Sequence, residues 1–311
     1  MNKQIVIDVR DLTKQYKKQV VVNHASFQIQ KGSICGLIGP NGAGKTTIMK
    51  MLGGLVLPSD GSFSLFGNSD ETNLAKARER MSFMIETPYA NQNLTAHQNL
   101  EKQRLQKGIP DKSRIDEVLE IVGLTNVGKK KFKEFSLGMK QRFGLANALF
   151  SKPEIMILDE PINGLDPEGI IEIRELLIKL NQQENITIMI SSHILSELSL
   201  MCDDYLFIVS GNIVKHLTRE ELHNECRNYL HIHTDNDELA VAVLQEKLKI
   251  TNFQVQKDGS LTLYEYVDNV APVSRTLFEN GVIPLELTTG GESLEEYYMS
   301  IVGGEENVEC N

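Results

Sequence analysis

The chain has 311 residues, of which 41% are hydrophobic and 24% are charged, a composition that excludes a disordered or fibrous protein. The net charge of −10 arises in residues 217–311, where 18 acidic side chains stand against 6 basic ones, so this part is not expected to bind nucleic acid or anionic lipid. No apolar run approaches the roughly 18 residues that cross a bilayer, and no signal-peptide core opens the chain, so we expect a cytoplasmic protein without direct membrane insertion.

The uneven charge also predicts where one domain ends. Residues 1–216 are nearly neutral, with 24 acidic and 26 basic side chains. We therefore predict a large domain over residues 1–217 and a small accessory domain over residues 218–311. The four cysteines contain no CxxC pair, which favours reduced structural thiols over a zinc site or a disulfide framework.

The large domain begins with strands and continues with helices. Short apolar runs bounded by polar residues or glycine predict strands over residues 5–9, 26–30 and 33–39. From about Leu74 to Phe150 the pattern becomes helical, which predicts an inserted helical subdomain over residues 74–150.

Continuous apolar runs after this insertion are typical of strands that are buried on both faces in a parallel sheet. They occupy residues 154–159, 185–192 and 204–211, and a helix is predicted over residues 170–180. The large domain is therefore predicted to have an α/β fold.

The accessory domain shows alternating strand and helix patterns. In chain order they predict a strand, a helix, two strands, a helix and a strand over residues 229–234, 238–248, 252–256, 260–265, 269–281 and 283–288. This order indicates a small α+β domain of the βαββαβ type.

The strongest single motif is a glycine loop that follows an apolar strand and precedes a helix. It reads GPNGAGKT and fits the G-x-x-x-x-G-K-[ST] pattern of phosphate-binding loops. Glycines let backbone N–H groups curl around anionic oxygens, and the helix directs its positive end at the same phosphates. The predicted nucleotide contacts are Gly39, Pro40, Asn41, Gly42, Ala43, Gly44, Lys45, Thr46 and Thr47, with the Thr46 hydroxyl placed to bind Mg²⁺.

A pair of acids, Asp159 and Glu160, ends the apolar run in IMILDEP (155–161). Ligands of open α/β sheets bind at this edge, and two acids there are costly without a cation. We interpret Asp159 as a ligand of Mg²⁺, directly or through water, and Glu160 as the general base that polarises the attacking water. The alternative is that the pair merely ends the strand and caps the next helix.

With these two motifs in place, FSLGMKQR (135–142) between them makes the chain resemble the ABC ATPase family, whose motif order it matches throughout residues 1–217. Ser136 and Gly138 match two positions of that family's signature loop, although Leu137 and Met139 depart from its usual second Gly and Gln. Taken alone, this segment would indicate only a helix start that can bind an anion. The resemblance implies a P-loop NTPase fold of ABC type, and a homodimer in which this loop contacts the ATP of the other subunit.

Three further residues receive roles only through the resemblance. Asp166 in GLDP resembles the family's D-loop near the dimer seam, and His193 resembles the catalytic switch histidine that contacts the γ-phosphate. Tyr16 matches the aromatic residue that stacks on adenine. Without the resemblance, His193 would be interpreted as a helix cap and Tyr16 as a surface residue beside a basic run.

Glu86 departs from most members of the family, which carry a glutamine here that contacts Mg²⁺ or water and relays the nucleotide state to the membrane subunit. A glutamate keeps the reach and an acceptor oxygen but adds a charge, so Glu86 is predicted to contact the nucleotide and Mg²⁺. This glutamate, a single motor domain and a C-terminal extension together resemble the exporters that confer bacitracin resistance or lantibiotic immunity.

The resemblance implies the ATPase subunit of a transporter, with ATP and Mg²⁺ as cofactors and integral membrane permease subunits on separate chains as partners. Such a subunit would lie on the inner face of the cell membrane through the permease. One alternative is a soluble ABC ATPase of translation or DNA maintenance, a class that usually carries two fused motor domains or a coiled coil, and basic surfaces. A second alternative is a nucleotide-dependent regulator, which an intact Glu160 disfavours.

Overall fold

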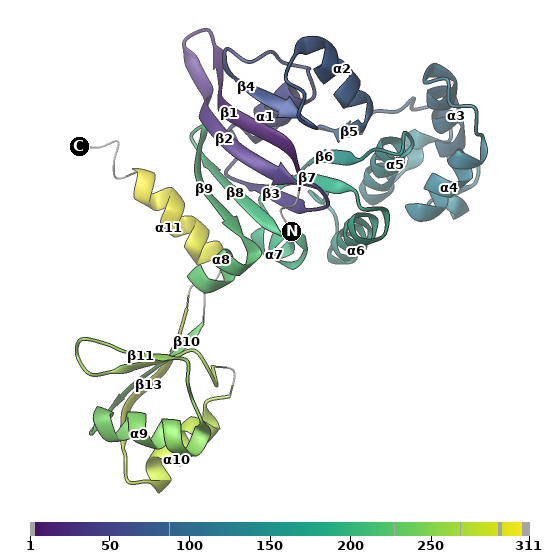
Figure 1. Cartoon of the computed structure of the whole chain (residues 1–311). Helices are drawn as coiled ribbons and strands as arrows, with labels where there is room; N and C mark the ends of the chain where they lie inside the picture. Colours follow the sequence, from purple (N-terminus) through teal and green to yellow (C-terminus); the bar gives the residue numbers. More distant parts are fainter. Residues whose placement is uncertain (1–3, 87, 227, 268, 292–293, 307–311) are drawn as a thin grey trace. The chain divides into compact units, whose positions relative to one another are not determined.

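The computed structural model describes residues 4–86, 88–226, 228–267, 269–291 and 294–306. The chain divides into two compact units, residues 1–219 and 220–311 (Figure 1). The division lies close to Leu217, where the charge of the sequence changes. Within the described residues, no helix is both long and apolar enough to cross a membrane.

A six-stranded sheet forms the centre of the first unit. Its strands are β3 (Ile34–Ile38), β5 (Met81–Met84), β6 (Ile155–Asp159), β7 (Thr187–Ser192), β8 (Asp204–Val209) and β9 (Asn212–Thr218). They lie in the order β5-β6-β7-β3-β8-β9, and neighbours run parallel except for the antiparallel pair β8 and β9. Every residue of β3, β6 and β7 is buried, as their continuous apolar runs predict. The predicted α/β fold is confirmed.

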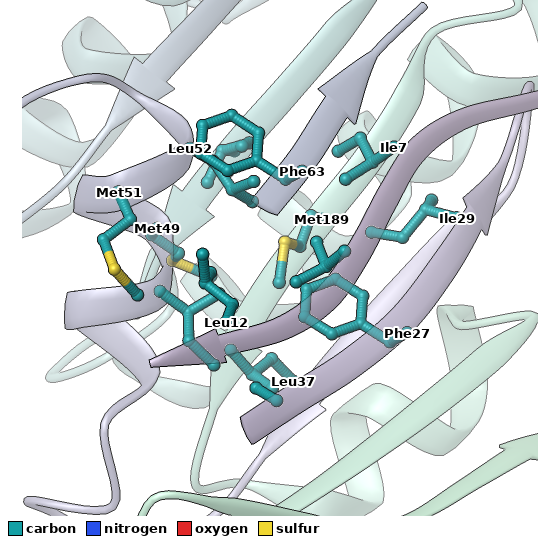
Figure 2. Packing of buried hydrophobic residues seen from close by; sticks show 14 of the residues in the cluster. Ile7, Leu12, Phe27, Ile29, Leu37, Met49, Met51, Leu52, Phe63 and Met189 are labelled. Atoms are coloured by element: carbon teal, nitrogen blue, oxygen red, sulfur yellow. The ribbon is translucent and has the colours of Figure 1, made fainter. Parts of the chain in front are cut away.

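A three-stranded antiparallel sheet packs against one side of this centre. It contains β1 (Ile5–Tyr16), β2 (Gln19–Gln30) and β4 (Asp60–Leu65), in the order β2-β1-β4. The first two are longer than predicted because their pairing continues to the turn that joins them. Helix α1 (Lys45–Leu52) contacts both β2 and β6. Apolar side chains of both sheets and of α1, among them Phe27, Leu37 and Met49, form one buried cluster (Figure 2).

Helices flank the large sheet and build the inserted subdomain. Helix α2 (Glu71–Glu79) contacts β4 and β5, α6 (Pro167–Glu184) contacts β7, and α7 (Leu195–Met201) contacts β3. The subdomain contains α3 (Ala96–Gln106), α4 (Ser113–Ile121) and α5 (Leu137–Leu149), with the 3-10 turns η1 (Thr125–Val127) and η2 (Phe132–Glu134).

The helical stretch predicted from about Leu74 is interrupted by β5, so that prediction was wrong for these residues. Its sequence MSFM is too short to show a strand period, and pairing with the buried strand β6 decides its conformation. The helices of the subdomain therefore begin only at Ala96.

The second unit contains the βαββαβ order that the sequence predicts. Its elements are α8 (Arg219–Glu225), which begins at the boundary, β10 (Tyr229–Thr234), α9 (Asp237–Leu248), β11 (Phe253–Val255), β12 (Leu261–Leu263), α10 (Ala271–Glu279), β13 (Pro284–Gly290) and α11 (Leu294–Glu306). The strands form an antiparallel sheet in the order β11-β12-β10-β13. Its core includes Leu230, Ile232, Leu244, Leu261 and Leu277. The terminal helices α8 and α11 were not predicted.

Candidate nucleotide site

The predicted phosphate loop lies at the carboxyl ends of the parallel strands. It follows β3 directly and leads into α1, and a hollow of about 180 Å³ lies against it. The hollow is lined by Val21, Pro40, Asn41, Gly42, Ala43, Gly44, Lys45, Thr46, Thr47, Asp159 and Glu160. The loop and the pair of acids, predicted from separate motifs, therefore share one concave site, at the edge where ligands of such sheets bind.

Gly44 shows why this loop needs glycine. It is the N-cap residue of α1 and has a φ of 106°, a backbone conformation that residues with a side chain rarely adopt. A Cβ atom at this position would lie 2.7 Å from the carbonyl oxygen of Val21 on β2. The close approach of β2 and this φ value together restrict the position to glycine.

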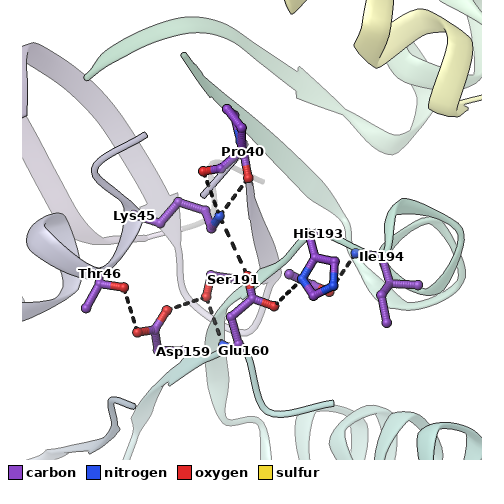
Figure 3. Close-up of polar contacts among 10 residues, drawn as sticks. Pro40, Lys45, Thr46, Asp159, Glu160, Ser191, His193 and Ile194 are labelled. Carbon is purple, nitrogen blue, oxygen red and sulfur yellow. Dashed lines mark hydrogen bonds and ion pairs between the residues drawn. The ribbon is translucent and has the colours of Figure 1, made fainter. Parts of the chain in front are cut away.

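Lys45 is buried beneath the loop, with only 6% of its surface exposed. Its Nζ donates hydrogen bonds to the carbonyl oxygens of Gly39 at 2.6 Å and Pro40 at 3.2 Å. The same ammonium group lies 3.6 Å from Oε1 of Glu160 (Figure 3). A positive charge is thus held between the loop and the acidic strand end.

A chain of hydrogen bonds connects the loop to both acids (Figure 3). The Thr46 hydroxyl donates to Oδ2 of Asp159 at 2.8 Å, and the Ser191 hydroxyl donates to Oδ1 of Asp159 at 2.7 Å. Ser191 Oγ in turn accepts from the backbone N–H of Glu160 at 2.9 Å. Both carboxylate oxygens of Asp159 are therefore oriented by hydroxyl groups from neighbouring elements.

Glu160 follows β6 with a φ of 49°, a sparsely populated value for a residue other than glycine. Its Oε2 accepts a hydrogen bond from Nδ1–H of His193 at 2.9 Å. Its Oε1 is buried and accepts no hydrogen bond within the part of the chain that is described. One oxygen of the carboxylate is thus anchored, and the other retains free lone pairs beside Lys45.

The donor groups around Asp159 fit a hard cation such as Mg²⁺. They are a carboxylate that is 6% exposed and two hydroxyl groups, and Mg²⁺ prefers oxygen ligands. No cluster of three or more His, Cys, Asp or Glu side chains with metal-binding geometry occurs within the described ranges. One or two carboxylates with substrate phosphates and water are the usual Mg²⁺ environment in nucleotide sites.

Ser136, Gly138 and Asp166 lie at the starts of two helices. Ser136 is the N-cap residue of α5 and accepts a hydrogen bond from the N–H of Met139 at 3.3 Å. Asp166 is the N-cap residue of α6 and accepts from the N–H of Gly169 at 3.2 Å. None of the three lines the hollow of its own chain. Their roles at a dimer seam stay predictions.

Tyr16 is the last residue of β1, and 45% of its surface is exposed. The ammonium group of Lys14 lies over its ring, 4.9 Å from the centroid. Tyr16 does not line the hollow. Stacking of adenine, which stays a prediction, would therefore use the other face of the ring or displace Lys14.

The carboxylate of Glu86 bonds to a lysine and to no predicted metal ligand that the structure describes. Its Oε1 accepts a hydrogen bond from Nζ of Lys50 at 2.5 Å, and 65% of its side chain is exposed. Thr46 and Asp159, the other predicted metal ligands, are in contact with each other. Of the predicted metal ligands, the structure thus brings together two and places the third beside α1.

Two residues at this site were missed from the sequence. Ser191 donates to the carboxylate of Asp159 and accepts from the backbone N–H of Glu160, and Lys50 donates to the carboxylate of Glu86. A serine near the end of a central apolar strand was the only available signal for the first. For Lys50, its spacing of four residues from Thr46 on one helix was the only signal.

Comparisons with known proteins show which proteins this chain resembles. The family model described as "ABC transporter" matches residues 22–163. The bacitracin transport ATP-binding protein BcrA of Enterococcus faecalis is 40% identical over 299 residues, which cover 96% of this chain and 97% of BcrA. The lantibiotic transport ATP-binding protein SrtF of Streptococcus pyogenes is 44% identical over 210 residues, covering 67% of this chain and 89% of SrtF.

About two thirds of the chain also matches the fold of a solved cassette. The structure of the ATP-binding cassette MJ0796, a dimer bound to ADP and Pi, matches with a TM-score of 0.63 at 24% identity, over 68% of this chain and 98% of that one. At this identity the match supports the fold alone. The match to BcrA extends over nearly the whole chain, and the chain therefore belongs to the ABC transporter family, as one of its ATP-binding ATPase subunits.

Proposed function

We propose that this chain powers the export of an antimicrobial peptide of the bacitracin or lantibiotic type by hydrolysing Mg·ATP at the site described above. The proposal of ATP hydrolysis rests on the contacts of the Glu160 carboxylate. One of its oxygens is held by His193, and the other is buried, free of hydrogen bonds from described residues and 3.6 Å from the lysine of the phosphate loop.

In the proposed reaction, the free oxygen of Glu160 accepts a proton from water as the water oxygen attacks the γ-phosphorus. The bond between that phosphorus and the bridging oxygen breaks, which yields ADP and phosphate. His193 keeps the carboxylate in one orientation through its Nδ1–H bond. A fixed base avoids the cost of ordering the side chain during the reaction.

Lys45 and the loop provide the charge that binds the triphosphate. The ammonium group of Lys45 donates hydrogen bonds to the carbonyl oxygens of Gly39 and Pro40. Phosphate oxygens would replace these acceptors and be met by backbone N–H groups of the loop. We infer that Thr46 and Asp159 hold Mg²⁺, which would neutralise part of the phosphate charge when bound.

Assembly into a dimer would complete the site. Ser136 is the N-cap residue of α5, and the backbone N–H groups at this helix start form a suitable anion site. Ser136 nevertheless does not line the hollow of its own chain. We infer that it serves the ATP of a second copy, with Asp166 near the seam. Separate permease subunits would hold the dimer at the inner face of the membrane.

The peptide class rests on the relatives. BcrA is named as a bacitracin transport protein and SrtF as a lantibiotic transport protein, and the match to BcrA includes the accessory domain. Glu86, the single motor domain and the accessory domain are the features of this chain that agree with such exporters. Susceptibility of cells to bacitracin and to a lantibiotic, with and without the chain and its permease, tests the class directly.

Glu160→Gln tests the catalytic part. The variant keeps the shape and one acceptor oxygen but cannot take up the proton, so ATP hydrolysis should fall by about 10²-fold or more. ATP binding, measured with a fluorescent analogue, should persist. The matched control is Glu184→Gln, at the exposed end of α6, which removes the same charge and should keep full activity. Equal turnover of the Glu160→Gln variant and the wild type would remove Glu160 from the mechanism.

A further inference from the structure

Glu86 stands at the same edge of the sheet as the two acids of the nucleotide site. Strands β5 and β6 run parallel with Met84 beside Leu158, and Glu86 and Glu160 each lie two residues further along. The φ of Glu86 is 63°, a backbone conformation that is costly for glutamate and is retained where the surrounding structure holds it. A carboxylate here adds a negative charge to the edge that must receive a triphosphate.

Lys50 compensates this charge from the helix that begins at the phosphate loop. It lies in the last turn of α1, four residues after Thr46, and therefore on the same side of the helix. Its ammonium group donates to Glu86 Oε1 at 2.5 Å. Helix α1 thus carries one lysine at the phosphate loop and, near its end, a second lysine that contacts Glu86.

The pair is too exposed to stabilise the fold strongly. The Lys50 side chain is 30% exposed and that of Glu86 is 65% exposed, and ion pairs at such positions contribute little to stability. The pair acts instead on the charge that a triphosphate at the phosphate loop would meet. A carboxylate without its partner would repel the phosphates, and this repulsion weakens as salt is added.

We propose that Lys50 is a positioning residue of the nucleotide site, which holds the carboxylate of Glu86 against α1 and cancels its charge so that Mg·ATP can bind. The proposal rests on the proposed function, since it assumes that Mg·ATP binds at the loop. It explains how this chain carries an acid at an edge that already holds Asp159 and Glu160.

The test is the affinity of the full-length chain for a fluorescent ATP analogue with Mg²⁺, measured by titration at low and at high salt. Lys50→Met should weaken binding about three- to fivefold at low salt and less at high salt. Lys50→Arg, which keeps the charge, should bind nearly as the wild type does. In the double variant Lys50→Met/Glu86→Gln, the affinity should return to that of Glu86→Gln alone.

The control is Lys76→Met, which removes an exposed lysine from α2 and should leave the affinity unchanged. Rescue by Glu86→Gln is the decisive measurement, since damage to α1 itself would persist in the double variant. Unchanged binding by Lys50→Met, or a double variant as weak as Lys50→Met, would overturn the proposal. A wild-type chain that binds no Mg·ATP would overturn the proposed function as well.

Discussion

Replacing Ser191 by alanine isolates the residue that joins the two acids of the site. Its hydroxyl is fully buried, donates to Asp159 at 2.7 Å and accepts from the N–H of Glu160 at 2.9 Å. Ser191→Ala removes one oxygen atom from a sheet that is otherwise unchanged. It leaves Asp159 with one fewer donor and the Glu160 N–H without its acceptor.

The two lost hydrogen bonds set the magnitude of the effect. A hydrogen bond to a charged group contributes about 1.5–3 kcal/mol, and an unpaired buried N–H costs about 1–3 kcal/mol. Taking the lower part of each range, we expect a loss of about 2.5–4 kcal/mol in the free energy of unfolding. A less constrained Glu160 should also lower kcat by about tenfold, equivalent to about 1.4 kcal/mol.

The assay is urea unfolding with steady-state ATP hydrolysis on the same preparations. Ser82→Ala is the matched control, because Ser82 lies on β5 of the same sheet and its buried hydroxyl has no partner among the described residues. That control should be neutral or slightly stabilising. If Ser191→Ala unfolds within about 0.5 kcal/mol of Ser82→Ala, the hydroxyl does not support the acids as we infer.

Two further predictions concern the loop and the ends of the strands. Gly44→Ala should destabilise the chain and abolish nucleotide binding. The control Gly67→Ala, at a φ of 79° and with no atom within 4 Å of the added Cβ, should lower the free energy of unfolding by only about 1 kcal/mol. Equal shifts in the melting temperatures of the two variants would argue against a clash at Gly44. Arg80 donates a hydrogen bond to Glu154 and thereby holds the pKa of this carboxyl group below its ordinary value of 4.5. The ionised carboxylate therefore stabilises the folded chain above pH 4.5, and this contribution is lost as the pH falls through the folded-state pKa. Glu154→Gln should therefore unfold more readily than the wild type near neutral pH and equally readily in acid, and a difference that persists in acid by urea unfolding would contradict this cause.

The local motifs of the site were predictable because each is contiguous. The phosphate loop combines its glycines, its lysine and its helix start within nine residues, from Gly39 to Thr47. Asp159 and Glu160 directly follow an apolar run that is buried in the structure on both faces. In both places the local chemistry and the burial of the preceding strand indicate the same edge of the sheet.

Other contacts depend on residues that are distant in the sequence. Ser191 lies 32 residues from Asp159, and Thr46 lies 113 residues from it. Lys50 and Glu86 are 36 residues apart, and β5, which places Glu86, was predicted as helix. No pattern within a short window specifies which strand lies beside which.

The sequence by itself determined the α/β class, the βαββαβ order of the accessory domain, the phosphate loop and the pair of acids. These features follow from hydrophobic periodicity and from residue chemistry that acts over a few neighbouring positions. Only the tertiary structure decided that MSFM is a strand, that a serine joins the two acids and that a lysine holds Glu86. The strand order, which brings these residues together, is selected by burial summed over the whole domain, and no single segment records that sum.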